Sequence, residues 1–289
     1  MKTLVHAYAK LNLSLDIVSR RPDGYHDMKM VMQSIGLCDD ITVACTDGNG
    51  TVSVSTNRYY LPSDRGNSAG KAAELFIEKA GISGVDISID ILKRIPVCAG
   101  MAGGSSDAAA VLRGLNELFG TGMERRALEE IGEALGSDVP YCVAGGTVLA
   151  QGRGEKLTEL DSLPDCHIVV CRPPFQVSTP ELFSRVRCER IKCRPDTEGM
   201  ISALRKGDLL GVGRRMFNVF EDILPQGKND VEHIKSVLIN CGALGASMSG
   251  SGPSVFGIFD DIGSAGRAYE ILSADYSDCF LTKSIKNFF

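Results

Sequence analysis

The sequence contains no C-x-x-C pair, although it has ten cysteines. The closest spacings, Cys166 to Cys171 and Cys188 to Cys193, fit neither a zinc knuckle nor the disulfide framework of a small secreted domain. We therefore expect the cysteines to be small buried hydrophobic residues in a reducing compartment.

Long apolar runs and an excess of positive charge are also missing. No segment approaches the roughly 20 apolar residues of a membrane-spanning helix, and the first residues, MKTLVHAYAKLNLSLDI, lack the pattern of a signal peptide. The formal net charge is −5, so no basic field draws the chain to nucleic acid or to an anionic membrane. We expect a cytoplasmic protein with no nucleic-acid or membrane partner, in which local groups hold any anionic substrate.

The first strand is predicted from alternating residues near the amino terminus. One face is expected to carry Leu11, Leu13, Leu15 and Ile17, and the other Lys10, Asn12, Ser14 and Asp16. Lys10 and Asn12 should therefore project together. The segment RRPDGYH that follows predicts a tight turn that exposes Tyr25 and His26.

The pattern in the rest of the sequence divides the chain of 289 residues into two halves. In residues 1–160, strands are expected at 41–45, 52–55, 85–91 and 146–152, and helices at 67–81, 108–119 and 124–135. In residues 161–289, the order is β-α-β-β-α-β with helices inserted over 196–241, which is the ferredoxin-like order. No Pro/Gly/Ser-rich linker separates the halves, so we expect them to pack together with a cleft between them.

A loop with few side chains precedes the helix over 108–119, in the segment IPVCAGMAGGSSDAAAVLRGLNELFG. Its glycines let backbone N–H groups approach a ligand closely. A helix that begins within 105–107 adds unpaired N–H groups and the positive end of its dipole. Neither G-x-x-x-x-G-K-[ST] nor G-x-G-x-x-G occurs. The pattern indicates a phosphate cradle of another type, and the alternative is a structural turn capped by a serine.

Six motifs in the chain resemble those of one family. PVCAGMAGGSSDAAAVL is similar to the second motif of the GHMP kinases (galactokinase, homoserine, mevalonate and phosphomevalonate kinases), which surrounds the phosphates of ATP. The other motifs are AKLNLSLDI, RRPDGYH, LGSDVPYCVAGG, GRGE and SMSGSGPSVFG. The order of the six motifs along the chain is the one expected for one branch of the family, which they resemble. The substrate of that branch is 4-(cytidine 5'-diphospho)-2-C-methyl-D-erythritol, from the non-mevalonate pathway of isoprenoid biosynthesis.

The resemblance implies a fold and a reaction. The fold is the α+β two-domain GHMP kinase fold, with an N-terminal ribosomal protein S5 domain 2-like half, a C-terminal ferredoxin-like half and the active site in the cleft. The reaction transfers the γ-phosphate of ATP, with Mg²⁺ expected, to the 2-hydroxyl of the cytidine substrate. Asp138 is implied as the base and Lys10 as its electrostatic partner, which agrees with the needs of phosphoryl transfer. Without the resemblance, both would be interpreted as ordinary surface residues.

The resemblance also implies the binding residues. The ATP loop comprises Pro96, Val97, Cys98, Ala99, Gly100, Met101, Ala102, Gly103, Gly104, Ser105 and Ser106, supported by Gly250, Ser251 and Gly252. Asn12 is expected to orient the methylerythritol, while Tyr25 and Phe183 sandwich the cytosine and His26 bonds its edge. The alternative for Phe183 is a core position on its helix. The metal ligands stay open, because the sequence does not distinguish a capping serine from a metal-contacting one.

The loop departs from the family pattern G-A-G-L-G-G-G-S-S at three positions, Cys98, Met101 and Ala102. We expect a negative φ at Ala102, which alanine tolerates, together with a weakened affinity for ATP. Two alternatives are another GHMP kinase, of the homoserine or mevalonate type, and a non-catalytic nucleotide or metabolite sensor. The motif DGYH argues against the first, and Lys10 with Asp138 against the second. Monomer and homodimer are both compatible with the sequence.

Overall fold

One long antiparallel hairpin, β1 (Lys2–Arg20) and β2 (His26–Asp47), organises the first sheet. The structure is a computed structural model that describes residues 1–63 and 66–286. The predicted turn joins the two strands, and there Asp23 Oδ1 accepts the backbone N–H of Tyr25, a bond that Asp commonly makes in turns. The other strands of this sheet are β3 (Val52–Thr56), β4 (Val85–Leu92), β5 (Thr147–Gly152), β6 (Lys156–Glu159) and β8 (Phe217–Asn218).

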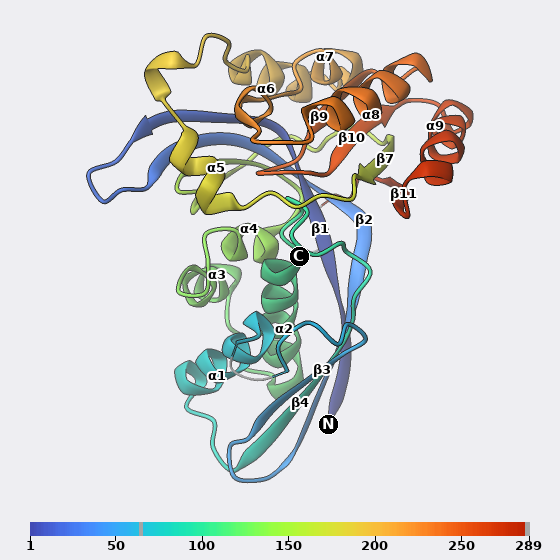
Figure 1. Ribbon diagram of the computed structural model, residues 1–289. Helices are drawn as coiled ribbons and strands as arrows, with labels where there is room; N and C mark the ends of the chain where they lie inside the picture. Colours follow the sequence, from blue (N-terminus) through green and yellow to red (C-terminus); the bar gives the residue numbers. More distant parts are fainter. Residues whose placement is uncertain (64–65, 287–289) are drawn as a thin grey trace.

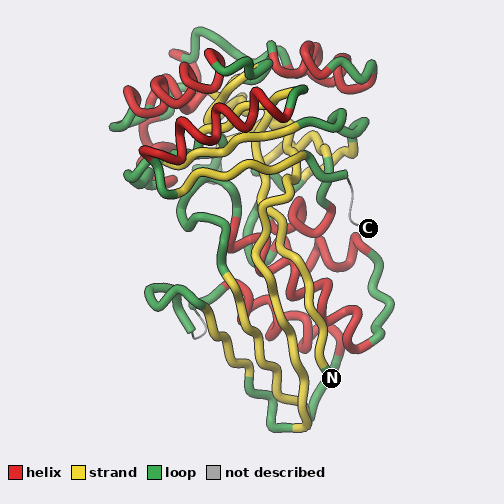
Figure 2. Tube along the Cα trace, turned by 90° about the vertical axis from the view of Figure 1, so that its right-hand side faces the viewer, coloured by secondary structure: helices red, strands yellow, loops and turns green. Residues whose placement is uncertain are grey.

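The helices of the first half lie along one face of the long strands (Figures 1 and 2). They are α1 (Ser68–Ala80), α2 (Gly103–Phe119), α3 (Arg125–Glu133) and α4 (Val139–Ala144). The first three confirm predicted helices, and the short α4 was not predicted. α1 begins where Asn67 accepts the N–H of Ala69, and Gly81 and Gly120 end α1 and α2 in the left-handed conformation.

A β-bulge in β1 corrects the predicted alternation. Asn12 pairs with Met32 and Leu15 pairs with Met30, so three residue steps along β1 match two steps along β2. One face of the strand therefore carries Lys10, Asn12, Leu15 and Ile17, and the other carries Leu11, Leu13, Ser14 and Asp16. The expected pairing of Lys10 with Asn12 is confirmed, whereas the four apolar residues do not share one face.

The second sheet confirms the predicted ferredoxin-like order. Its strands are β7 (His167–Arg172), β9 (Gly245–Met248), β10 (Val255–Phe259) and β11 (Asp278–Lys283), in the spatial order β11-β7-β10-β9. The two helices that complete the motif are α8 (Lys228–Asn240) and α9 (Ile262–Asp275). α8 lies within 196–241, where only inserted helices were expected, so that part of the prediction is corrected: the helix at Thr179 is itself an inserted segment. The inserted segments are α5 (Thr179–Arg185), η1 (Cys188–Arg190), α6 (Thr197–Arg205), α7 (Leu209–Gly213) and η2 (Val219–Ile223).

The second sheet follows most of the first in the sequence and lies at one end of its long strands. Figure 1 shows the later part of the chain, coloured yellow to red, at one end of the long strands β1 and β2. β6 ends at Glu159 and β7 begins at His167, but β8 returns to pair with β1 in the first sheet. The division of the domains at residue 160 remains a proposal.

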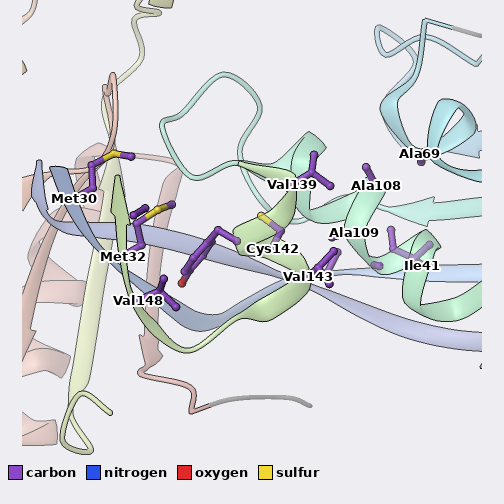
Figure 3. Packing of buried hydrophobic residues seen from close by; sticks show 14 of the residues in the cluster. Met30, Met32, Ile41, Ala69, Ala108, Ala109, Val139, Cys142, Val143 and Val148 are labelled. Carbon is purple, nitrogen blue, oxygen red and sulfur yellow. The ribbon is translucent and has the colours of Figure 1, made fainter. Parts of the chain in front are cut away.

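The core of the first half fixes α2 and α4 against the sheet. Figure 3 shows Val139 and Cys142 of α4 between Met32 of β2 on one side and Ala108 and Ala109 of α2 on the other. Small alanine side chains let a helix lie close to a strand, so the start of α2 is held over β1. Close packing of this kind leaves little room for displacement.

The cysteines only partly follow the prediction. All ten are free, and the buried ones are Cys45, Cys142, Cys166, Cys171 and Cys279. Cys98 and Cys193 are exposed, which corrects the expectation that all are buried. Among the described residues, no helix is both long and apolar enough to cross a membrane.

Candidate active site

A cleft of about 1890 Å³ brings together segments from both halves of the chain. It is lined by β1, the hairpin turn, the glycine loop, α5 and the loop at 250–252. Among the predicted site residues, only Met101 and Ser106 do not line it; both are buried beneath the loop. Met101 O accepts the N–H of Lys10, and Ser106 Oγ donates to Tyr8 O. These two residues therefore hold the loop on β1.

Lys10 and Asp138 face each other in this cleft. Lys10 Nζ lies 3.9 Å from Asp138 Oδ2 and donates to Asn12 Oδ1 at 2.7 Å. Lys10 is only 4% exposed, so its interpretation as an ordinary solvated lysine is wrong. Asp138 stands immediately before α4, with its side chain 36% exposed. The pair thus offers a cation fixed by Asn12 and a carboxylate that a ligand in the cleft can reach.

The glycine loop contradicts the conformation predicted for Ala102. Its φ is 55°, and that of Cys98 is 53°, so both residues lie in the left-handed region. This region costs an L-residue about 1 to 2 kcal/mol. Ala102 is also the residue before α2, which begins at Gly103 without a side-chain cap. The alternative interpretation of the loop, a turn capped by a serine, is therefore wrong, and the first N–H groups of α2 are available to an anion.

Replacing Ala102 by glycine is expected to stabilise the protein. Ala102→Gly relieves the left-handed strain but adds conformational entropy to the unfolded chain, so the free energy of unfolding should rise by about 0.5 to 1 kcal/mol. Urea denaturation measures this change. Ala127→Gly inside α3 is the matched control and should lower the free energy of unfolding instead. A loss of stability in Ala102→Gly would contradict the assignment of strain.

The loop at 250–252 packs directly on the glycine loop. Ser249 Oγ donates to Gly100 O at 3.0 Å, and Ser254 N donates to Ala99 O at 3.4 Å. A Cβ on Gly100 would lie 2.1 Å from Ser249 O, and a Cβ on Gly250 would lie 2.8 Å from Gly100 O. Only glycine permits this approach of two backbones. A Cβ on Gly250 would also lie 3.1 Å from Lys10 Nζ, so this contact lies next to Lys10.

A buried ion triad, which was not predicted from the sequence, anchors the glycine loop. Lys93 Nζ donates to Asp39 Oδ2 at 2.6 Å and to Asp107 Oδ2 at 2.7 Å, and all three residues are at most 4% exposed. Asp39 Oδ1 also accepts the backbone N–H groups of Arg94 and Ile95. The triad therefore ties the residues before the loop to the first turns of α2.

The charges of the triad are set by burial and by one another. Burial raises the pKa of Asp107 to about 7, although Lys93 opposes the shift. Burial also disfavours the charged form of Lys93, but Asp107 and Asp39 outweigh it, so the pKa of Lys93 is raised. The sequence signal was the acidic Asp107 itself, placed where phosphate was expected. Its partners Asp39 and Lys93 come from β2 and the end of β4, too distant in sequence to be paired by inspection.

Aromatic residues line the other end of the cleft. The His26 ring stacks on Phe183 with centroids 5.3 Å apart, and Phe183 packs edge-on against Phe220 at 5.0 Å. Tyr25 is 58% exposed at the rim, with the Arg153 guanidinium 5.5 Å from its ring centroid. His26 is buried, which corrects the expectation that the turn exposes both residues. Arg153 belongs to the motif GRGE, and no role for it was predicted from the sequence. Its position over Tyr25 fits a cation–π contact that holds the exposed ring.

Burial lowers the pKa of His26, with a smaller effect from Arg20. The stabilisation from the neutral imidazole is then fully present above the unfolded-state pKa of about 6.5 and is lost as pH falls through the lower folded-state pKa. We expect the wild type to lose more free energy of unfolding than His26→Gln between about pH 7 and pH 5. Urea denaturation at both pH values measures this, and an equal loss would contradict a lowered pKa.

The model of the GHMP kinases N terminal domain matches residues 67–146, and that of the GHMP kinases C terminal domain matches residues 200–278. A relative from Clostridium kluyveri is 43% identical and covers 98% of this chain and 100% of its own length. A relative from Acetivibrio thermocellus is 43% identical and covers 96% and 98%. Both are named 4-diphosphocytidyl-2-C-methyl-D-erythritol kinase.

Solved structures agree with these relatives. A crystal structure of 4-(cytidine 5'-diphospho)-2C-methyl-D-erythritol kinase superposes with a TM-score of 0.80 at 32% identity, covering 98% of this chain and 99% of that one. Homoserine kinase from Cytophaga hutchinsonii has a TM-score of 0.76 at 21% identity, covering 99% and 95%, which shows a shared fold. Because the chain is 43% identical to these two relatives over nearly its full length, it belongs to the 4-diphosphocytidyl-2-C-methyl-D-erythritol kinase family of the GHMP kinases.

Proposed function

We propose that this kinase transfers the γ-phosphate of ATP to the 2-hydroxyl of 4-(cytidine 5'-diphospho)-2-C-methyl-D-erythritol, with Asp138 as the base and Lys10 as its electrostatic partner. Membership of the family supports the reaction. The observation that carries the site is the 3.9 Å approach of Lys10 Nζ to Asp138 Oδ2 in the cleft. We further propose that the enzyme acts in the cytoplasm.

The proposed mechanism relies on positioning and on charge neutralisation, as phosphoryl transfer generally does. Backbone N–H groups of the glycine loop and the start of α2 bind the phosphates of ATP. Asn12 Oδ1 accepts from Lys10 Nζ and so keeps the cation beside Asp138. Asp138 accepts the proton of the attacking hydroxyl, and Lys10 offsets the negative charge that develops between hydroxyl and phosphate.

A magnesium ion fits the residues beside the loop. Within residues 1–63 and 66–286, Asp107 Oδ1 is a buried carboxylate oxygen that lacks a hydrogen-bond partner. Asp107 and Ser105 both line the cleft, and kinases bind Mg²⁺ through few protein oxygens together with substrate phosphates. We propose that these two residues hold the ion, which when bound neutralises phosphate charge.

The cytosine is proposed to bind at the aromatic end of the cleft. Tyr25 and Phe183 offer two ring faces, and the neutral imidazole of His26 offers one donor and one acceptor to the edge of the base. Stacking alone does not distinguish one base from another, so the edge contacts must supply selectivity. Mutation of Tyr25 therefore tests affinity, and mutation of His26 tests selectivity.

Loss of the Tyr25 ring is expected to weaken binding of the cytidine substrate. Tyr25→Ala should cost about 1 to 3 kcal/mol in kcat/KM for this substrate, mainly through KM, while KM for ATP stays unchanged. Steady-state kinetics with each substrate varied in turn separates the two effects. Tyr59→Ala, another exposed tyrosine, is the control. An unchanged KM for the cytidine substrate would remove Tyr25 from the base pocket.

A coupled assay of ADP release tests the reaction itself. The enzyme is supplied with ATP and Mg²⁺, with and without 4-(cytidine 5'-diphospho)-2-C-methyl-D-erythritol. We expect ADP release to depend on this substrate, and homoserine and mevalonate to give little or none. Comparable efficiency with a substrate that lacks the cytidine group would overturn the proposed specificity. ATP binding without turnover would favour a sensor instead.

A further inference from the structure

A cluster of three metal-ligand side chains lies on the β1–β2 ladder, apart from the cleft. The ligand atoms of His6, Cys38 and Asp40 all lie within 4.8 Å of one another. His6 pairs directly with Asp40 across the ladder, and Cys38 is two residues before Asp40, so the three side chains share one face of the sheet. None of them lines the cleft described above.

The donor set of this cluster selects the kind of ion. An imidazole nitrogen, a thiolate sulfur and a carboxylate oxygen suit Zn²⁺ and similar transition metals. Mg²⁺, the ion expected with ATP, prefers oxygen ligands and is not held by a thiolate. We propose that His6, Cys38 and Asp40 form a site for one transition-metal ion of the Zn²⁺ class, with water as the fourth ligand.

Two of the three ligand atoms are close to the spacing that a tetrahedral site needs. His6 Nδ1 and Asp40 Oδ1 lie 2.9 Å apart. Two such ligands of one zinc ion are separated by about 3.3 Å, so they need to move apart by only a few tenths of an ångström. The His6 side chain is 49% exposed and that of Asp40 24%, which leaves a path for the ion from solvent.

Neighbouring arginines already orient the ligands. Arg94 Nη2 donates to Asp40 Oδ2 at 2.6 Å, so Oδ1 is the oxygen directed toward His6. Carboxylates that bind metals usually accept such an outer hydrogen bond. Arg113 Nη2 donates to His6 O at 2.7 Å and fixes the backbone that carries the imidazole.

The backbone beneath the cluster is held from the opposite face. Asp39, between Cys38 and Asp40, is fully buried and bonded to Lys93 and to two backbone N–H groups. Ligands on a strand that is fixed in this way keep their spacing. They should therefore bind a metal ion better than the same ligands on a loop would. On binding, the Cys38 thiol releases its proton to solvent, and the His6 ring keeps its proton on Nε2 while Nδ1 binds the ion.

Cobalt is the probe for this site, because Co²⁺ bound by thiolate absorbs in the near ultraviolet. The full chain, reduced and freed of metal, is titrated with Co²⁺ alone. We expect one equivalent to bind with a thiolate charge-transfer band that Zn²⁺ abolishes and Mg²⁺ does not. His6→Ala and Cys38→Ser should each weaken Co²⁺ binding by about tenfold or more. If His6→Ala does not fold, His6→Gln replaces it in the measurement of Co²⁺ affinity.

Matched variants separate this cluster from other ligands. His233→Ala and Cys193→Ser remove exposed residues of the same types elsewhere and should bind Co²⁺ as the wild type does. Circular dichroism without metal checks that each variant is folded. The proposal is overturned if the wild type binds no stoichiometric Co²⁺, or if the control variants lose as much affinity as the cluster variants.

Discussion

Asp138→Asn is expected to lower kcat by about a hundredfold or more, the usual loss when a general base is removed. The asparagine keeps the shape of the side chain but cannot accept the hydroxyl proton. Because Asp138 is partly exposed and its nearest charged partner, Lys10, retains its bond to Asn12, the free energy of unfolding should change little. Single-turnover kinetics at saturating substrate measures the chemical step, and urea denaturation measures the stability.

Two further variants make this result specific. Asp161→Asn changes an exposed carboxylate outside the cleft and should leave kcat unaffected. Lys10→Met is expected to lower kcat as well, and the double variant with Asp138→Asn should lose less than the sum, because the two groups act on one transition state. Near-normal turnover of Asp138→Asn would remove this carboxylate from the mechanism.

The features predicted well from the sequence are local ones. The glycine loop and the helix after it were predicted because their spacing lies within one short segment, 95–120. The ferredoxin-like order followed from the sequence of strands and helices in the second half. The pairing of Lys10 with Asp138 is different in kind. Their residue types alone favoured solvent-exposed positions, and only the order of six motifs placed them together.

The features that the sequence did not predict depend on the tertiary structure. The bulge after Asn12 moves Leu15 to the other face of β1, and no residue there departs from an ordinary strand pattern. The left-handed φ of Ala102 is imposed by the fold against the preference of alanine. The strand pairs that surround Lys93 could not be assigned without the register of β2 and β4.

Lys93→Met is expected to destabilise the protein by about 3 to 5 kcal/mol, the usual loss when one partner of a buried ion pair is removed. Methionine fills a similar volume but leaves Asp39 and Asp107 without their shared cation. Because Asp39 also holds the backbone before the glycine loop, KM for ATP should rise more than KM for the cytidine substrate. Urea denaturation and steady-state kinetics check the two effects.

A second substitution tests whether uncompensated charge is the cause of the loss. Asp107→Asn in the Lys93→Met background removes one of the two buried carboxylates, so the double variant should recover part of the lost stability. Lys71→Met, at an exposed position on α1, is the control for losing a lysine and should change the free energy of unfolding by less than about 0.5 kcal/mol. If Lys93→Met unfolds as the control does, the triad does not anchor the loop. If the free energy of unfolding of the double variant is lower than that of Lys93→Met, lost packing rather than charge explains the effect.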